Sequence, residues 1–377
     1  MVYLRRYQMS LFRPMRLLLL TMLTALVVGA VHLWNHVADL AEPVLTPINK
    51  SYAGYSLIPQ KVLGLKLEQF TFTGWDGGEV RAVIARKDGE ESSRQLTITG
   101  ALNQNKADRL REIDYALICV DWDHGIRSAI PLAESLTAAG LTCVLWEPRG
   151  ADNRRPHCTH GLRESADVPL LINELTRRSG KANPVIIGVG QGYGAGLMLQ
   201  AAATEPRILG LVSIDAYASL RESIIRTMPN TPLTLATLSL MDLRINSSVG
   251  FECFDVAPVE SAARLDRHVP VLVINLVRDN PISTLEDAVT IYRQLPSDHR
   301  ELWTLRAPSD SPGATTRTIQ PEGSGSRKSP INAILHKDED SAVIGIVHWL
   351  NDTFMSAMDT PHVHTPARPL LTSDCQL

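Results

Sequence analysis

The chain has 377 residues, of which 44% are hydrophobic, and its formal net charge at pH 7 is −3. This length and apolar content are enough for one large domain with a buried core. The charge balance gives no basic surface for nucleic acid, so we expect no nucleic-acid partner. The five cysteines do not have the spacing of a disulfide framework, and we expect Cys119 and Cys143 to be small buried residues of core strands.

A basic segment and an apolar segment begin the chain. Residues 1–16 contain four arginines, and residues 17–34 form an uncharged apolar run that ends at Trp34. Such a run is at the short end of what spans a bilayer, and basic flanks stay in the cytoplasm, so we expect a signal anchor that holds the large domain outside the cytoplasm. The alternative is a cleaved signal peptide and a secreted domain, because Val28-Gly29-Ala30 has the small-residue pattern that signal peptidase accepts.

The rest of the chain divides into a linker, a domain and a tail. Residues 35–60 are interrupted by prolines, which predicts a linker, and residues 357–377 predict a disordered tail. The domain is expected over residues 61–356. It opens with Leu65–Thr73 and Glu79–Arg86, two strand-like runs around a glycine-rich turn, which predict an antiparallel hairpin. Gln95–Thr99 has the pattern of a further strand.

Buried strands then alternate with helices, which predicts an α/β fold with a mostly parallel central sheet and helices on both faces. The expected strands are Tyr115–Asp121, Leu141–Trp146, Val185–Val189, Ile208–Ile214, Val271–Leu276 and Glu301–Leu305, and the expected helices include Ser128–Ala139 and Leu162–Arg178. Residues 219–250 are positioned for lid helices.

A glycine cluster follows the strand Val185–Val189 and precedes an apolar helical pattern. This order resembles the G-x-S-x-G turn, in which a serine occupies a strained position that exposes its hydroxyl. In Gly190-Gln191-Gly192-Tyr193-Gly194 the central residue is Gly192, and a frame two residues earlier puts Gly190 there. Neither frame supplies a Ser, Cys, Asp or Thr. The alternatives are a plain tight connection or a phosphate cradle.

The order of these segments, with phrases such as EPRILGLVSIDAYASLRESI and DVAPVESAARLDRHVPVLVINLVRDNPI, resembles serine hydrolases of the α/β-hydrolase fold, in the branch of membrane-linked esterases and peptidase-like hydrolases. The resemblance covers Leu65 to Phe354. It implies that Asp279 is the retained catalytic acid and that Gly192 occupies the position of the lost nucleophile.

The other catalytic elements of the resemblance have no clear counterpart. The family histidine should follow the strand Glu301–Leu305, but Arg306–Pro330 contains no histidine. Asn332 is then the possible position of the lost histidine, Asp310 or Ser311 takes it in another alignment, and His336 reaches the site only if the loop packs unusually. The oxyanion loop, His-Gly in the family, is here Asp121-Trp122 or, in a shifted alignment, His124-Gly125.

Two further groups are candidate sites. Asp121, Trp122 and His124 lie where the carboxyl edge of the sheet binds ligands, and with Gln191 and Tyr193 they form the candidate binding residues; the alternative is a solvated loop with a packed Trp. The segment His157-Cys158-Thr159-His160 has side chains that bind zinc, but no second cluster lies near it in sequence, so we expect a surface loop and no metal or other cofactor.

The sequence therefore favours a catalytically degenerate, membrane-anchored protein of the α/β-hydrolase fold that binds a small apolar or peptide ligand or a protein partner. One alternative is an active serine hydrolase with a non-standard nucleophile, such as Ser213 or Ser311, and His336 or His124 as its base. Another is an interaction protein that uses the Arg306–Pro330 loop.

Overall fold

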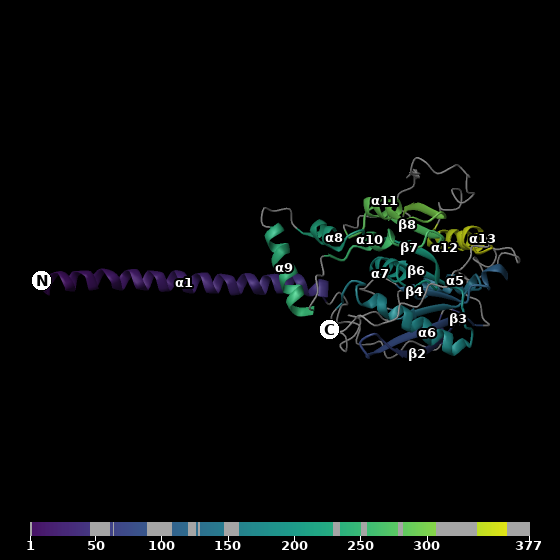
Figure 1. The fold of residues 1–377 in the computed structure, drawn as a ribbon, viewed down its shortest axis with the longest axis horizontal. Coiled ribbons are helices and arrows are strands. Elements are labelled where there is room, and N and C mark those ends of the chain that lie inside the picture. The colour runs from purple at the N-terminus through teal and green to yellow at the C-terminus, as the bar shows by residue number, and fades with distance from the viewer. Residues whose placement is uncertain are drawn as a thin grey trace.

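The computed structural model describes residues 2–45, 61–62, 64–88, 108–119, 126, 129–146, 158–228, 234–249, 255–277, 282–306 and 338–359. Figure 1 shows one α/β body and a long N-terminal helix that projects from it. The positions Asp121, Trp122, His124, Asp279, Asn332, Asp310, Ser311 and His336, and the predicted strand Gln95–Thr99, lie outside these ranges.

One nine-stranded sheet with the order β1-β2-β3-β5-β4-β6-β7-β8-β9 forms the centre of the body. Strands β4 to β9 are parallel, while β1, β2 and β3 pair antiparallel with one another and β3 pairs antiparallel with β5. Their bounds are Lys61–Val62, Leu65–Thr73, Glu79–Lys87, Tyr115–Cys119, Cys143–Trp146, Ile186–Gln191, Ile208–Ile214, Val271–Val277 and Arg300–Arg306. The mostly parallel sheet and the antiparallel entry hairpin predicted from the sequence are confirmed.

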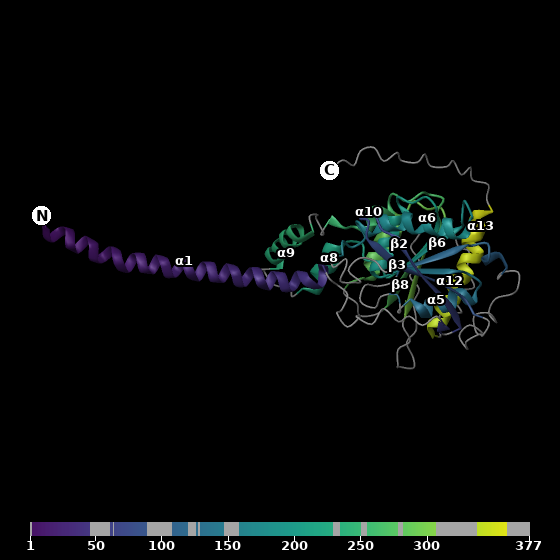
Figure 2. The ribbon, with the colours of Figure 1, turned by 90° about the horizontal axis from the view of Figure 1, so that it is seen from below.

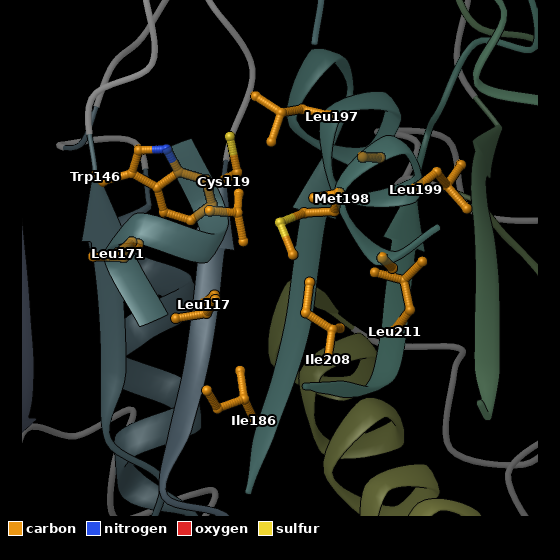
Figure 3. Close-up of a cluster of buried hydrophobic side chains, with 14 of the residues drawn as sticks. Leu117, Cys119, Trp146, Leu171, Ile186, Leu197, Met198, Leu199, Ile208 and Leu211 are labelled. Atoms are coloured by element: carbon orange, nitrogen blue, oxygen red, sulfur yellow. The ribbon is translucent and has the colours of Figure 1, made fainter. Parts of the chain in front are cut away.

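Helices cover both faces of this sheet. One face carries α5 (Ile130–Ala138), α12 (Asp338–Trp349), a π-helical turn (Leu350–Phe354) and α13 (Met355–Met358). The other carries α6 (Asp167–Ser179), preceded by the 3-10 turn Glu164–Ala166, with α7 (Tyr193–Ala202), α10 (Pro258–Ala262) and α11 (Leu285–Gln294). Figure 3 shows the second core, in which side chains of α6 and α7 meet those of β4, β5 and β7.

Both cores are closely packed against the strands. Phe354 of the π-helical turn lies on β7 at Gly210, where an added Cβ would come within 2.5 Å of its ring. Cys119 and Cys143 are buried and free, as expected for small core residues. Burial also raises the pKa of the Cys143 thiol, which keeps it neutral.

The N-terminal helix α1 (Val2–Leu45) is longer than the predicted membrane segment. Residues 35–45, predicted as part of a linker, continue the helix, because Val37, Ala41 and Val44 repeat on one face and are buried against the body. Their partners lie in α8 (Leu220–Thr227), in α9 (Thr234–Val249) and in the loops around them. Figures 1 and 2 both show α9 beside the last turns of α1.

Candidate functional site

The turn between β6 and α7 has the backbone of a nucleophile elbow. Gly192 adopts φ 56° and ψ −121° at the N-cap of α7. Its N–H donates to the carbonyl oxygen of Ile214 at the end of β7, over 2.8 Å. At Gly190 an added Cβ would come within 2.4 Å of the Cα of Ala195, so the strand and the helix approach too closely for any side chain there. These are the roles that the first and central positions of the motif require.

The geometry selects between the two frames considered for the glycine cluster. Gly190 belongs to β6, whereas Gly192 carries the positive φ of the turn, so the frame Gly190 to Gly194 is the structural one. Gly192 is the central residue of this frame and has no side chain, and its assignment as the position of a lost nucleophile stays a prediction. The strand order and this turn decide the fold. The chain has the α/β-hydrolase fold.

The turn lies beside the place where the sheet reverses its strand order. The chain leaves β4 for β5 on one side and leaves β6 for β7 on the other, so the carboxyl ends of β4 and β6 flank the reversal. Cys119, the last residue of β4, pairs with Gly190. Ligands of open α/β sheets bind at this kind of position. Asp121 follows β4 by two residues, and Asp279 follows β8 by two, so both remain predictions for this edge.

The two candidate binding residues next to the glycine turn are described. Gln191 is half-buried at the end of β6, and the ring of Tyr193 is buried in the core beneath the turn, edge-on to the imidazole of His160 with 6.0 Å between ring centres. Burial, followed by neighbouring thiol and carboxyl groups, raises the pKa of the Tyr193 phenol well above its usual range. In this conformation Tyr193 is a packing residue, and ligand binding by Gln191 stays a prediction.

A buried polar cluster lies under the turn, and it corrects one expectation. Cys158, Thr159 and His160 were expected in a surface loop, but all three are buried. The Glu164 carboxylate accepts hydrogen bonds from the backbone N–H of Thr159, at 2.7 Å, and of Gly161, at 2.9 Å. Burial raises the pKa of Glu164, although these hydrogen bonds oppose the effect. The segment is internal because it turns back under α7, a contact that its polar composition does not reveal.

His160 joins this cluster to the N-terminal helix. Its Nε2 donates to the carbonyl oxygen of Val44 in α1, over 2.8 Å, and its backbone φ is 53°. Burial lowers the pKa of the imidazole to about 4, so it is neutral at physiological pH. Among the described residues no group of three or more His, Cys, Asp or Glu side chains could hold a metal ion.

Asp215 is a residue at this edge that sequence reasoning missed. It follows β7 directly, is buried and has a φ of 53°. Its Oδ1 accepts a hydrogen bond from the backbone N–H of Leu276 at 2.6 Å, and its own backbone N–H donates to the carbonyl oxygen of Ile274 at 2.8 Å. Asp215 thus joins the ends of β7 and β8 by hydrogen bonds beside the glycine turn. A lone Asp directly after a buried strand was the only signal that could have found it.

Ser213, one of the alternative nucleophiles, lies inside β7. Its side chain is fully buried, and its hydroxyl has no hydrogen-bond partner among the residues that the structure describes. A nucleophilic serine needs an imidazole within hydrogen-bond reach and access to substrate. In this conformation Ser213 has neither among the described contacts.

No model of a known protein family matches the chain, and no curated protein matches it. Solved structures that resemble it include the esterase Pf2001 of Pyrococcus furiosus, with TM-score 0.48 and 14% identity over 67% of this chain and 88% of the esterase. The acylaminoacyl peptidase of Pyrococcus horikoshii has TM-score 0.44 and 15% identity over 67% of this chain and 39% of the peptidase. A 2,6-dihydroxy-pseudo-oxynicotine hydrolase has TM-score 0.49 and 12% identity over 77% of this chain and 69% of the hydrolase.

These neighbours are an esterase, a peptidase and a hydrolase of the α/β-hydrolase fold. The assignment of the fold to this chain rests on its own strand order and turn, because likeness at these identities and TM-scores carries no argument about activity. Asp279, Asn332, Asp121, Trp122 and His124 lie outside the described residues, so their roles remain those that the sequence predicts.

Proposed function

We propose that this protein is a catalytically degenerate member of the α/β-hydrolase fold, anchored in a membrane by α1, which binds a small apolar or peptide ligand or a protein partner instead of hydrolysing a substrate. The observation that carries the proposal is Gly192 at the tip of the elbow, with a positive φ and no side chain.

Acyl transfer on this fold requires a nucleophile, an imidazole and an acid acting as a unit. Removing the nucleophile from such a unit costs about a millionfold in turnover, or about 8 kcal/mol of transition-state stabilisation. A glycine has no atom that could form the acyl intermediate. The retained acid at Asp279 then has no catalytic serine to support through a histidine.

His160 does not supply the missing base. Its imidazole is buried, its Nε2–H is committed to the Val44 carbonyl oxygen, and its pKa of about 4 leaves it a poor proton acceptor at neutral pH. A general base works best when its pKa is near the operating pH. The role of this histidine is to hold the end of α1 against the domain.

Membrane anchoring is supported by the length and surface of α1. Residues Leu18–Ala41 are apolar enough to cross a membrane, with a mean hydropathy of 1.8, and residues 18–36 are exposed throughout. A helix over residues 18–36 measures about 28 Å, close to the roughly 30 Å hydrocarbon core of a bilayer. The arginines before residue 17 favour an extracytoplasmic domain.

The test is labelling of the full-length chain, in detergent or in liposomes, with a fluorophosphonate probe and an assay with p-nitrophenyl esters. We expect no labelling and no turnover above the buffer rate, with an active esterase as the positive control. Labelling at a single serine, together with turnover lost when that serine becomes alanine, would overturn the proposal and establish an active hydrolase with a non-standard nucleophile.

A further inference from the structure

The described exposed positions of α9 carry no charged side chain, and Asp242 and Arg244 beside them are half-buried. Leu238, Met241 and Ile245 point into the cluster shared with α1, while the exposed positions of the helix are Leu235, Ala236, Ser239, Leu243 and Ser247. Leu235 is 66% exposed and Leu243 is 57% exposed. The two leucines are within about 80° of one another around the helix axis, so they share one face.

This helix meets α1 where the exposed apolar segment of α1 ends. The side chains of residues 18–36 of α1 are exposed, and burial against the body begins at Val37. The guanidinium of Arg244 in α9 lies 5.3 Å from the ring centre of Trp34. Tryptophan is enriched at the level of lipid headgroups, and Trp34 would lie there if residues 18–36 span the bilayer.

Figures 1 and 2 show α9 crossing the line of α1 rather than continuing it. A helix that crosses a membrane-spanning helix at headgroup level lies along the membrane surface. Helices in this position bury an apolar face about 5–10 Å deep at the headgroup boundary. The exposed positions of α9 are two leucines, an alanine and two serines, a composition that suits such burial.

The end of α1 also fixes which side of the domain faces the membrane. Val44 contacts His160, in the segment between β5 and α6, and α1 packs with Tyr217, just after β7. Both positions follow the carboxyl ends of parallel strands, the edge at which Gly192 lies. The docked helix therefore holds this edge toward the bilayer.

We propose that α9 rests on the membrane surface with Leu235 and Leu243 in lipid, and that the carboxyl edge of the sheet faces the bilayer. The proposal rests on the anchoring role given to α1 above. Its occupant is the lipid surface rather than a protein, because α1 itself carries α9 to that surface.

The test places nitroxide labels on the full-length chain in liposomes at Leu235→Cys and Leu243→Cys. The matched control is Ala182→Cys, an exposed position shortly before the amino end of β6, on the opposite edge of the sheet. Collision rates with oxygen, which concentrates in lipid, and with a water-soluble nickel chelate are compared. The unsubstituted chain, treated with the same label, gives the background from native cysteines.

We expect the ratio of oxygen to nickel collisions at positions 235 and 243 to exceed that at position 182 several-fold. Equal ratios at the three positions, in a chain that resists extraction by alkaline carbonate, would overturn the placement of α9 and leave the anchor intact. Extraction of the chain by carbonate would overturn the anchor and the placement together.

Discussion

Gly192 holds φ 56° and ψ −121° in the turn after β6, a conformation that costs about 1–3 kcal/mol for a residue with a side chain. Active hydrolases tolerate this strain because the turn exposes their nucleophile. Here a glycine adopts the same backbone without this strain, and it has no side chain for the turn to expose. The close approach of β6 and α7 at Gly190 offers a structural reason for this backbone, since the tight packing itself fixes the turn.

The substitution Gly192→Ser tests this reading of the turn. We expect the free energy of unfolding to fall by about 1–3 kcal/mol, because the serine must adopt the strained φ, and we expect no ester hydrolysis, because triad groups act as a unit. The double variant Gly192→Ser with Asn332→His should hydrolyse esters faster than the single variant if Asn332 is the position of the lost histidine. Denaturation and p-nitrophenyl acetate assays measure both effects, and turnover in the single variant would mean that a base already lies at the site.

His160 predicts a pH dependence of stability. Its pKa falls from 6.5 to about 4 on folding, so the unfolded chain binds a proton more readily than the folded chain within that window. The contribution of neutral His160 to the free energy of unfolding is therefore complete above about pH 6.5 and is lost as the pH falls to about 4. The free energy of unfolding changes by about 1.4 kcal/mol per pH unit in this window, and by about 3 kcal/mol in total.

The matched control for this effect is His160→Gln, which has an N–H for the Val44 carbonyl oxygen and does not titrate. Glu164, whose raised pKa has the opposite effect on stability as the pH falls, is present in both proteins and cancels in the comparison. Urea denaturation at pH 7 and pH 5 should show a larger fall in the free energy of unfolding for the natural chain than for the variant. Equal falls in the two proteins would contradict the burial of a neutral imidazole.

At the scale of elements, α1 combines an exposed apolar segment and a segment docked on the domain in one helix. Residues 18–36 are exposed, while Val37, Ala41 and Val44 complete a core with α8 and α9. The sequence pattern separates these two parts poorly, because both are apolar. The two parts differ in the one-sided repeat at positions 37, 41 and 44. This repeat is recognisable as a docking face only when the positions of α8 and α9 are known.

Ala41→Asp should disrupt this docking. A carboxylate at this position, which is 1% exposed, would lie among the apolar side chains of the cluster around α1, so we expect the free energy of unfolding to fall by about 3–5 kcal/mol. Asn35→Asp, which adds the same charge at an exposed position of the same helix, is the control and should be nearly neutral. Thermal unfolding in detergent compares them; equal melting temperatures would mean that α1 does not dock.

For the whole molecule, the arrangement of α1 and the domain gives a prediction of membrane topology. The arginines before residue 17 favour a cytoplasmic N-terminus, so the domain should lie outside the cytoplasm. A membrane-impermeant maleimide added to intact cells should label Ala182→Cys, whose side chain lies on the exposed surface. The unsubstituted chain serves as the baseline. Labelling that appears only after lysis would place the domain on the cytoplasmic side.

The sequence by itself determined the alternation of strands and helices, the antiparallel entry hairpin and the position of the glycine turn. These features are local, because hydrophobic periodicity and glycine content act over a few residues. Leu65–Thr73 and Ile208–Ile214 have the predicted bounds, and Gly192 has the strained φ at the expected place.

Only the tertiary structure decided which distant residues meet around the glycine turn. Two hydrogen bonds join residues that are far apart in the chain. His160 donates to the carbonyl oxygen of Val44, and Asp215 accepts from the backbone N–H of Leu276. No periodicity within one segment records such partners, because each contact depends on how the sheet brings separate strand ends to one edge. Local patterns therefore placed the glycine turn, and long-range packing placed the end of α1 against His160, α8 and α9.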